Sequence, residues 1–556
     1  MGEKEIFKIK SDWVGIREKS IFWIGCLLIV VLVYDFQGVA FKNPYGMHQW
    51  RQSDAYSMAL NFAQEDRSLW NPEMHFQHGN AGGEAIGEFP LTYYLNGNLW
   101  KMLGSIAPWT MRWIHLMLLL LGMGALFRLF RTQLPMWFSA GAVWFVMASG
   151  LLAFYGPNYL VNAGALGLVF AGWWTAYRWS ETGLRLNGRL GLMLLSLTMA
   201  VLLRPTMALG WIPLFIASIG IRHKARWMLA CVIPLFIGAA YVWWTKGVNA
   251  ANESTYFLTT IRPIWLSEDP GQIWKSFRED VLPQWYHFYV LIALLIALTR
   301  ATFLGLRMNS TNRFFVTFLA FLGTAVGLLI YFLLWFDNLN VHDYYLIEFQ
   351  LLVPLALALL GLAGQQSSFV PSAIGRVLFI CLLLFQLTES AIRTRMKYRV
   401  TKGVLAELLI PSRELKQWEW FHWDQNLRFA NSEDWKGLLR SHGINREELV
   451  ISVPDPSPNI TLSIMDQKGF TDLYDNHLVG NDRIAHYVGL GAKYLLCNDE
   501  RWYQKHESSP WLTKQMTQLG NFRVFELLDS NAHLQSNSES SSIEIENSET
   551  EITENR

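Results

Sequence analysis

Long apolar runs separated by short polar turns fill most of the chain up to residue 391. A helix that spans a bilayer needs about 20 mostly apolar residues. Runs on that scale cover roughly 21–40, 109–127, 134–153, 158–177, 226–245, 285–299, 314–336, 344–363 and 377–391. A further stretch, 190–221, is broken by Arg204-Pro205, and we predict two helices that meet at this dipeptide. The pattern predicts a polytopic α-helical membrane protein with about eleven transmembrane helices, the first an uncleaved span.

The Lys and Arg residues of the short turns alternate from side to side under this assignment. One side carries the Lys-rich N-terminus and the basic turns near 128–131, 178–189, 222–226 and 300–313, whereas the turns near 155–158 and 337–342 carry no Lys or Arg. The positive-inside rule places the basic side in the cytoplasm. An odd number of spans then places the C-terminal region on the outer face. The basic cluster at 393–399 runs against the rule, but long translocated domains are largely exempt from it.

Three segments do not read as membrane spans: 40–108, 246–284 and the region from 392 onward. In the last, 449–453, 492–496 and 522–527 have the composition of short strands between helical stretches. We therefore predict a transmembrane catalytic domain over 1–391 that includes the outer loop 40–108, and a small outer-face α/β domain over 392–530. The Ser-, Glu- and Asn-rich tail, 531–556, is predicted to be disordered.

Composition narrows the class of protein. A hydrophobic fraction of 52% and a charged fraction of 16% exclude an ordinary soluble enzyme. The net charge of +1 offers no basic field for a nucleic-acid partner. The four cysteines, three of them inside apolar runs, form neither a disulfide framework nor a thiolate metal site. The sequence has no P-loop, no His-Glu-x-x-His and no Gly-rich dinucleotide motif, so it gives no support for nucleotide hydrolysis or nucleotide-sugar use.

Candidate chemistry begins with two acidic residues in the loop 40–108. A helix is expected over 48–62, with an apolar stripe from Ala55 to Phe62 at helical spacing. Asp54 lies one turn before Met58 and one turn after Arg51, so it belongs to the buried edge of an amphipathic surface helix. The alternative is a cap formed by Ser53 or Asp54 together with a local ion pair.

The second acidic residue, Glu88, precedes a helix that is expected to start at Pro90. Its apolar stripe consists of Leu91, Tyr94, Leu95, Leu99 and Met102. Glu88 could serve only helix stability through the helix dipole. A catalytic role is favoured by location, because both carboxylates are placed at the outer membrane interface, where a lipid-linked substrate presents its head group. The polar stretch 75–83 between them is suited to a substrate-facing loop.

These elements resemble the GT-C superfamily of membrane glycosyltransferases. The likeness consists of an N-terminal span, an acidic residue in an amphipathic helix of a large outer loop, and an acidic-x-Pro-Leu-x-x-Tyr-Leu element, Glu88 to Leu95. The chain is similar to the bacterial aminoarabinose transferase and protein O-mannosyltransferase group, specifically over 48–95. The resemblance implies that Asp54 is the catalytic base, that Glu88 lines the same site, and that the donor is a polyprenyl-phosphate sugar.

Two positions depart from the pattern of this group. Asp54 is followed by Ala55 where the mannosyltransferases have Asp-Glu, and Phe89-Pro90 stands where the aminoarabinose transferases have Lys-Pro-Pro. The Lys that binds the donor phosphate is therefore missing, and the phosphate contacts must come from elsewhere.

Several other side chains are candidates for binding the donor. Arg204 lies at the predicted helix break near the outer face, where an intramembrane cation is functional unless it snorkels to lipid head groups. His342, Asp343 and Tyr345 form a polar aromatic cluster that could hold a sugar or phosphate, or could be an interfacial belt with a helix cap. The remaining candidate substrate-binding residues are Arg51, Tyr56, Tyr93 and Arg262.

The sequence thus predicts an inverting glycosyltransferase of the cytoplasmic (inner) membrane. Asp54 would accept a proton from an acceptor hydroxyl of a lipid, protein or polysaccharide, while Glu88 orients hydroxyls or shares a divalent metal ion. Metal dependence stays open. A transporter or flippase is an alternative, because polar helix breaks also mark transport pathways. A ligase or polymerase of lipid-linked oligosaccharides is a further alternative, but its diphosphate donor calls for more basic residues on the outer face.

Overall fold

The computed structural model describes residues 3–78, 82–254, 257, 261–307, 312–340, 342–366, 373–473 and 481–527. The predicted disordered tail, 531–556, lies outside them. The chain divides into two compact units, which are described separately. The helical unit comprises Met1–His48, Ile86–Val248 and Tyr256–Glu419, and the mixed unit comprises Gln49–Ala85, Asn249–Thr255 and Trp420–Arg556.

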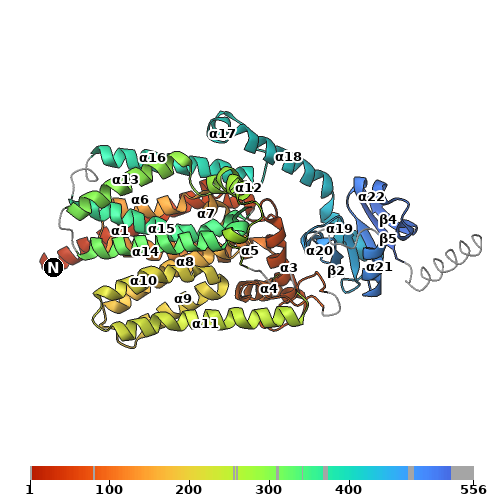
Figure 1. The fold of residues 1–556 in the computed structure, drawn as a ribbon, viewed down its shortest axis with the longest axis horizontal. Helices are drawn as coiled ribbons and strands as arrows, with labels where there is room; N and C mark the ends of the chain where they lie inside the picture. The colour runs from red at the N-terminus through yellow and green to blue at the C-terminus, as the bar shows by residue number, and fades with distance from the viewer. Residues whose placement is uncertain are drawn as a thin grey trace, which may run out of the picture. The chain divides into compact units, whose positions relative to one another are not determined.

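Long helices with roughly parallel axes form most of the helical unit (Figure 1). Its α-helices are α1 (Glu3–Leu32), α2 (Phe36–Val39), α4 (Leu91–Leu103), α5 (Pro108–Arg131), α6 (Met136–Met147), α7 (Gly150–Tyr155), α8 (Asn162–Ser180), α9 (Gly188–Leu203), α10 (Ile212–Ala217), α11 (Lys224–Ala251), α12 (Pro270–Ser276), α13 (Phe288–Arg307), α14 (Asn312–Leu334), α15 (Leu352–Gln366), α16 (Ala373–Met396) and α17 (Val404–Leu409). α18 (Ser412–Arg428) continues from this unit into the mixed unit.

Each apolar run of the sequence coincides with helical structure. Within the described residues, six helical segments are long and apolar enough to cross a membrane: 108–131, 224–251, 288–305, 313–334, 343–365 and 373–396. The run 134–153 is divided into α6 and α7. The stretch 190–221 breaks at the predicted dipeptide, because α9 ends at Leu203 and a 3-10 helix, Pro205–Trp211, begins directly after Arg204. Proline lacks the N–H that would continue the ladder of α9.

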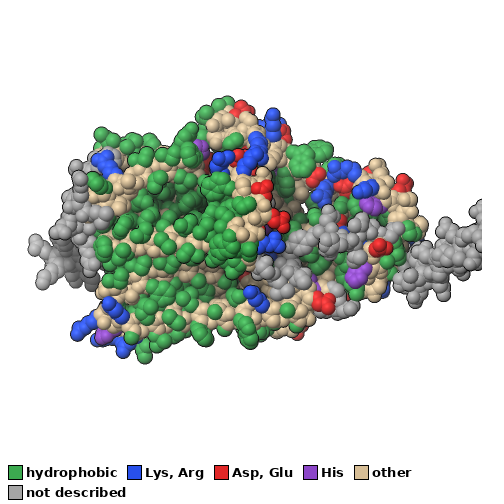
Figure 2. Space-filling view, viewed as in Figure 1, with side chains coloured by type: hydrophobic (Ala, Val, Ile, Leu, Met, Phe, Trp, Pro, Cys, Tyr) green, Lys and Arg blue, Asp and Glu red, His purple; other side chains and the backbone are tan. Residues whose placement is uncertain are grey.

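The outer faces of these helices are apolar. Large hydrophobic side chains that point outward include Leu27 of α1, Phe236 of α11, Leu295 of α13 and Leu384 of α16, each more than half exposed. Figure 2 shows hydrophobic side chains over the visible face of the helical unit, with Lys and Arg at the end where α10 meets α11. Apolar patches of this extent are rare on soluble monomers but suit contact with lipid. The protein is a multi-pass membrane protein.

The mixed unit is built around a five-stranded sheet with the order β2-β1-β3-β5-β4. The strands are β1 (Val450–Val453), β2 (Gly469–Thr471), β3 (Tyr494–Cys497), β4 (Gln515–Leu519) and β5 (Phe522–Glu526), and the remaining helices are α3 (Gln49–Gln64), α19 (Ser432–Ser441), α20 (Ile460–Met465), α21 (Asn481–Gly489) and α22 (Glu500–His506). β1 pairs in parallel with β2 and β3, whereas β5 pairs antiparallel with β3 and β4. The three strands predicted from sequence are confirmed.

Two apolar layers cover the two faces of this sheet. Ile451 and Leu495 contribute to a cluster that includes Trp511, whereas their neighbours Val450 and Leu496 contribute to a cluster that includes Trp435. This division follows from the strand geometry, in which successive side chains point to opposite faces. β2 and β4 were not predicted, because Gly469–Thr471 is too short and Gln515–Leu519 too polar to show an apolar pattern.

Residues of the loop 40–108 belong to the mixed unit as well. The backbone N–H of Gln77 donates to the carbonyl of Gly469 at 2.8 Å, and that of Gly469 donates to the carbonyl of His75 at 3.1 Å. The segment after α3 therefore lies against β2, and through it α3 is held close to residues that follow it by about 400 positions in the sequence.

Candidate active site

Asp54 lies well inside a helix. α3 starts at Gln49, directly after His48, whose backbone has a positive φ of 53°. Asp54 is therefore in the second turn, and the interpretation of Ser53 or Asp54 as a cap is wrong. The predicted pair exists, with Arg51 Nη1 at 3.1 Å from Asp54 Oδ2. Residues 52–62 are all buried, so α3 is a buried helix and not the surface helix that its apolar stripe predicts.

The Asp54 carboxylate has a second partner from a distant part of the chain. Asn459 Nδ2 donates to Asp54 Oδ1 at 2.9 Å, and Asp54 is only 1% exposed. Tyr56 is also buried on α3, but residues two apart on a helix do not face each other. Of the candidates on this helix, the structure therefore joins Arg51 to Asp54 and leaves Tyr56 on another face.

A polar network fixes the C-terminal end of α3 within the mixed unit. Asp466 Oδ2 accepts from Gln64 Nε2 at 2.6 Å and from Lys436 Nζ at 2.8 Å, and its Oδ1 lies 3.0 Å from His75 Nε2. Burial opposes ionisation of Asp466, but the hydrogen bonds from His75 and Lys436 prevail and hold the pKa of its carboxyl well below the usual range. The network ties the C-terminal end of α3 to the segment that follows α20.

Glu88 is held by a different set of contacts in the helical unit. Tyr93 OH donates a short hydrogen bond to Glu88 Oε1, so the structure brings these two candidates together. The backbone N–H of Phe89 donates to the carbonyl of Leu202 at 3.1 Å, two residues before Arg204. The segment that carries Glu88 is thereby tied to the helix break at the end of α9.

The apolar stripe predicted for α4 points outward. Leu95 is 48% exposed and Met102 85%, whereas Thr92, Asn96 and Trp100 on the other side of the helix are buried. The sequence pattern identified the stripe correctly. The stripe is partly exposed surface and not protein core, since the more polar side of α4 packs inward.

Arg204 is part of a cluster with a buried carboxylate. Its Nε donates to Glu348 Oε1 at 2.9 Å, and Thr206 Oγ1 donates to the same oxygen. Its guanidinium lies over the Tyr345 ring at 4.7 Å from the centroid, within the range of a cation–π contact. Among the described residues, neither Arg204 Nη2 nor Glu348 Oε2 has a hydrogen-bond partner, although both atoms are buried.

Asp343 is the centre of a neighbouring cluster. His48 Nε2 lies 3.0 Å from its Oδ1, Tyr155 OH donates to the same oxygen, and Lys397 Nζ lies 3.5 Å from Oδ2. Asp343 is fully buried. Its carboxylate thus joins the end of α7, the segment after α16 and the residue before α3. These contacts give Asp343 a structural role.

His342 links the two clusters, whereas Arg262 belongs to neither. The His342 ring lies 5.2 Å from that of Tyr344 and 5.8 Å from that of Tyr345. Arg262 is exposed in the segment before α12, and its backbone carbonyl accepts from the N–H of Asp337. Among the described residues, the contacts of Arg204 and Asp343 do not include its guanidinium.

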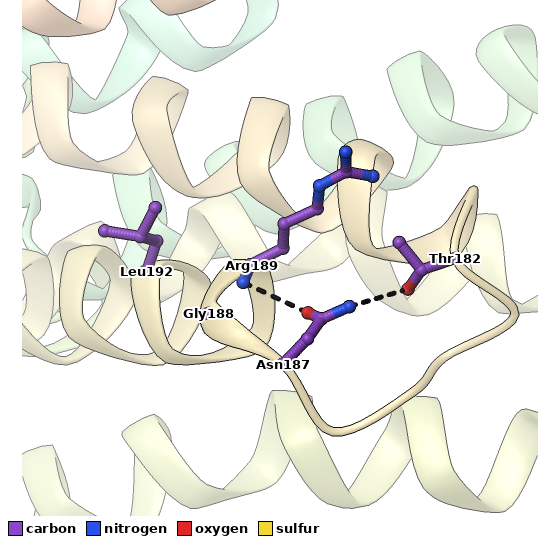
Figure 3. A pocket seen from close by; sticks show the side chains of 5 residues that line it. All are labelled: Thr182, Asn187, Gly188, Arg189 and Leu192. Carbon is purple, nitrogen blue, oxygen red and sulfur yellow. Dashed lines mark hydrogen bonds between the residues drawn. The ribbon is translucent and has the colours of Figure 1, made fainter.

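Neither the surface hollow of the helical unit nor the placement of possible metal ligands identifies a further site residue. The hollow lies at the turn between α8 and α9, where Asn187 Oδ1 accepts from the backbone N–H of Arg189 and Asn187 Nδ2 donates to Thr182 (Figure 3). None of its lining residues is a candidate. In the part of the chain that the structure describes, no three His, Cys, Asp or Glu side chains group as metal ligands. A shared metal ion for Asp54 and Glu88 stays a prediction.

Sequence reasoning missed Glu348 and Asn459, which contact Arg204 and Asp54, as well as the three partners of Asp343, which are His48, Tyr155 and Lys397. Glu348 carried a signal, because it is the single charged residue in the apolar run 344–363. Asn459 carried none beyond a chance glycosylation sequon, since it meets Asp54 across 405 residues of sequence.

Comparison with known proteins adds evidence at the level of the fold. No protein-family model matches the sequence, and no curated protein matches it. The structure is similar to that of ArnT from Cupriavidus metallidurans bound to undecaprenyl phosphate, with a TM-score of 0.50, 11% identity, and coverage of 91% of this chain and 98% of that one.

Two further solved structures are similar with lower scores. The mycobacterial arabinofuranosyltransferase AftD gives a TM-score of 0.45 at 13% identity over 92% of this chain, which spans 40% of the AftD chain. The Archaeoglobus fulgidus oligosaccharyltransferase gives 0.44 at 12% identity, over 86% of this chain and 69% of that one. The match to ArnT shows a shared fold, which agrees with the fold expected from the sequence resemblance.

Proposed function

From the GT-C fold of this chain we propose that it is a membrane glycosyltransferase that moves a sugar from a polyprenyl-phosphate carrier to an acceptor hydroxyl. The observation that carries the proposal is the match to a structure bound to undecaprenyl phosphate over nearly the whole of both chains. The acceptor is a lipid, a protein or a polysaccharide. The reaction takes place at the outer face of the cytoplasmic membrane, which the distribution of Lys and Arg among the turns supports.

Arg204 is proposed to bind the donor phosphate. Its Nε is held by Glu348, and its buried Nη2 has no hydrogen-bond partner among the described residues. A buried donor of this kind has capacity for a further acceptor. A phosphate oxygen supplies the required acceptor, and the planar guanidinium can bind it while Nε keeps its bond to Glu348. Arg204 thereby compensates for the Lys that is missing at Phe89.

Asp54 is proposed to act as the general base. The acceptor O–H bond breaks as its proton passes to Asp54, and the acceptor oxygen bonds to the anomeric carbon. The bond from that carbon to the phosphate oxygen breaks, and its electron pair leaves with the lipid phosphate. Attack from the side opposite the phosphate inverts the anomeric configuration. One base and a cation at the leaving group suffice for this step, so no separate general acid is needed.

Glu88 is proposed to orient hydroxyls of the sugar or of the acceptor. Its hydrogen bond from Tyr93 and the backbone tie from Phe89 to Leu202 hold it in place beside the Arg204 helix break. In the alternative, Glu88 and Asp54 would share a divalent metal ion, which would supply positive charge at the reacting oxygens. Transfer assays with and without EDTA distinguish the two, because only the metal-sharing form loses activity on chelation.

The test compares cells that lack the chain with cells complemented by wild type, Asp54→Asn or Asp434→Asn. Asp434 is an exposed carboxylate of the same unit and serves as the matched control. Mass spectrometry of lipid-linked sugars and surface glycans is expected to show accumulation of one polyprenyl-phosphate sugar and loss of that sugar from one glycan. Wild type and Asp434→Asn should reverse both changes, and Asp54→Asn neither. Unchanged lipid-linked sugars in the deletion, or full complementation by Asp54→Asn, would contradict the proposal.

A further inference from the structure

Asn459 occupies the N-cap position of α20, yet its side chain does not cap that helix. The first N–H groups of α20 are satisfied by other residues: Ser457 Oγ accepts from the N–H of Ile460 at 2.9 Å, and Asp455 Oδ2 accepts from that of Thr461 at 2.8 Å. A cap residue normally uses its own oxygen for this purpose. Because two neighbours replace it, the carboxamide of Asn459 is directed to α3 instead.

The contacts of this carboxamide determine its orientation. Asn459 Nδ2 donates to Asp54 Oδ1 at 2.9 Å, and Asn459 Oδ1 accepts from the backbone N–H of Phe76 at 3.1 Å. A flipped amide would place a carbonyl oxygen against the carboxylate and an NH₂ group against the N–H of Phe76, so only one assignment is compatible with both partners. Asn459 is fully buried, and its position is therefore closely defined.

Together with the proposed role of Asp54 as base, this geometry leads to a role for the C-terminal region. We propose that Asn459 is a positioning residue that orients the Asp54 carboxylate for proton transfer. Arg51 donates to Oδ2 and Asn459 donates to Oδ1, so the plane of the carboxylate is fixed from both sides. Each carboxylate oxygen can accept more than one hydrogen bond, so these two donors do not by themselves prevent an acceptor hydroxyl from donating to the same carboxylate. Residues that follow the transmembrane helices thus act directly on the catalytic base.

A purely structural role for Asn459 would work through its other atom. Asn459 Oδ1 accepts from Phe76 and Ser57 and so helps to hold the segment after α3. Asn459→Asp keeps oxygens for these donors but has no amide N–H for Asp54. Wild-type kcat in Asn459→Asp would therefore show that the N–H is dispensable. A loss of kcat in this variant also includes repulsion between the two carboxylates, so it is assigned to positioning only together with Asn459→Ala and the double-mutant cycle described below. Asn459→Ala removes both functions.

Gln64→Ala provides a matched control. Gln64 Nε2 donates to Asp466 Oδ2 at 2.6 Å, so it ties the same helix, α3, to the segment just after α20 without a contact to Asp54. Wild type and the three variants are compared in the full-length protein at equal amounts of folded material. Asn459→Asp and Asn459→Ala are expected to lower kcat roughly 10- to 100-fold with donor KM within about twofold of wild type, because a misplaced base slows chemistry but not binding. Gln64→Ala is expected to stay within about threefold in kcat.

Three outcomes would overturn the proposal: wild-type kcat in Asn459→Asp, an equal loss of kcat in Gln64→Ala, or an increase of donor KM without a change of kcat. A double-mutant cycle adds a readout that a structural role does not produce. In an Asp54→Asn background, measured by single turnover, Asn459→Ala should cause no further loss. The inference fails separately from the proposed function: if wild type transfers no sugar the function is wrong, whereas if wild type transfers sugar and Asn459→Asp equals it, only the inference is wrong.

Discussion

Replacing Arg204 with Ala separates a folding role of this guanidinium from a role in binding the donor phosphate. Arg204 Nε and Glu348 Oε1 are 2.9 Å apart, and Glu348 is fully buried. Removing one partner of a buried ion pair leaves an uncompensated charge and costs about 3 to 5 kcal/mol. Arg204→Ala should therefore lower the free energy of unfolding by about this amount. Removing both charges, in Arg204→Ala with Glu348→Gln, should restore most of it.

Sugar transfer should respond differently from stability. If Arg204 neutralises the leaving phosphate, its loss costs about 3 kcal/mol of transition-state stabilisation, or roughly 100-fold in kcat, by analogy with lost oxyanion donors. The double variant regains stability but should stay as slow as the single one. Arg204→Lys should keep partial activity, because Lys replaces the fork only as a point charge.

The assay measures thermal unfolding in nanodiscs and transfer rate at equal amounts of folded protein. Arg131→Ala is the control, because its 3.0 Å pair with Glu18 is about one-third exposed on both sides and should contribute less than about 1 kcal/mol. Near wild-type transfer by the stable double variant would restrict Arg204 to folding. Full stability of Arg204→Ala would refute the reasoning on the buried pair itself.

Further predictions concern the base, the topology and the pH response. Asp54→Asn should lower the transfer rate by about 100-fold or more with normal insertion, and a wild-type rate in the purified variant would exclude Asp54 as the base. A reporter active only outside the cytoplasm should be active after Leu527 and silent after Arg307, and the reverse result would mean a miscounted span. Burial lowers the pKa of His78 from 6.5 to about 4. The unfolded chain therefore binds a proton between these pH values and the folded chain does not. The contribution of His78 to the free energy of unfolding is full above pH 6.5 and falls as the pH approaches 4, by about 2 kcal/mol at pH 5. Thermal unfolding should show this loss in wild type and in the exposed control His442→Gln but less of it in His78→Gln, and equal pH slopes in all three would contradict the assignment.

The local pattern of apolar and polar residues determined the helices and strands of this protein and the ion pair between residues of one helix. Apolar runs gave the helices, the Arg204-Pro205 dipeptide gave the break after α9, and the composition of three short segments gave three of the five strands. The Arg51 and Asp54 pair followed from helical spacing alone. These features depend on residues a few positions apart, and the chain geometry of a helix or strand places such residues without reference to the rest of the molecule.

The partners that candidate residues have in distant elements were decided only by tertiary structure. Glu348 reaches Arg204 across 144 residues, and Asn459 reaches Asp54 across 405. Sequence periodicity likewise did not predict that the apolar stripe of α4 points outward, or that polar Ser57 and Asn61 on α3 are buried. The physical reason is the same in each case: a period shows which residues share a face, but only packing determines whether that face meets lipid, a core, or a hydrogen-bond partner from a distant segment.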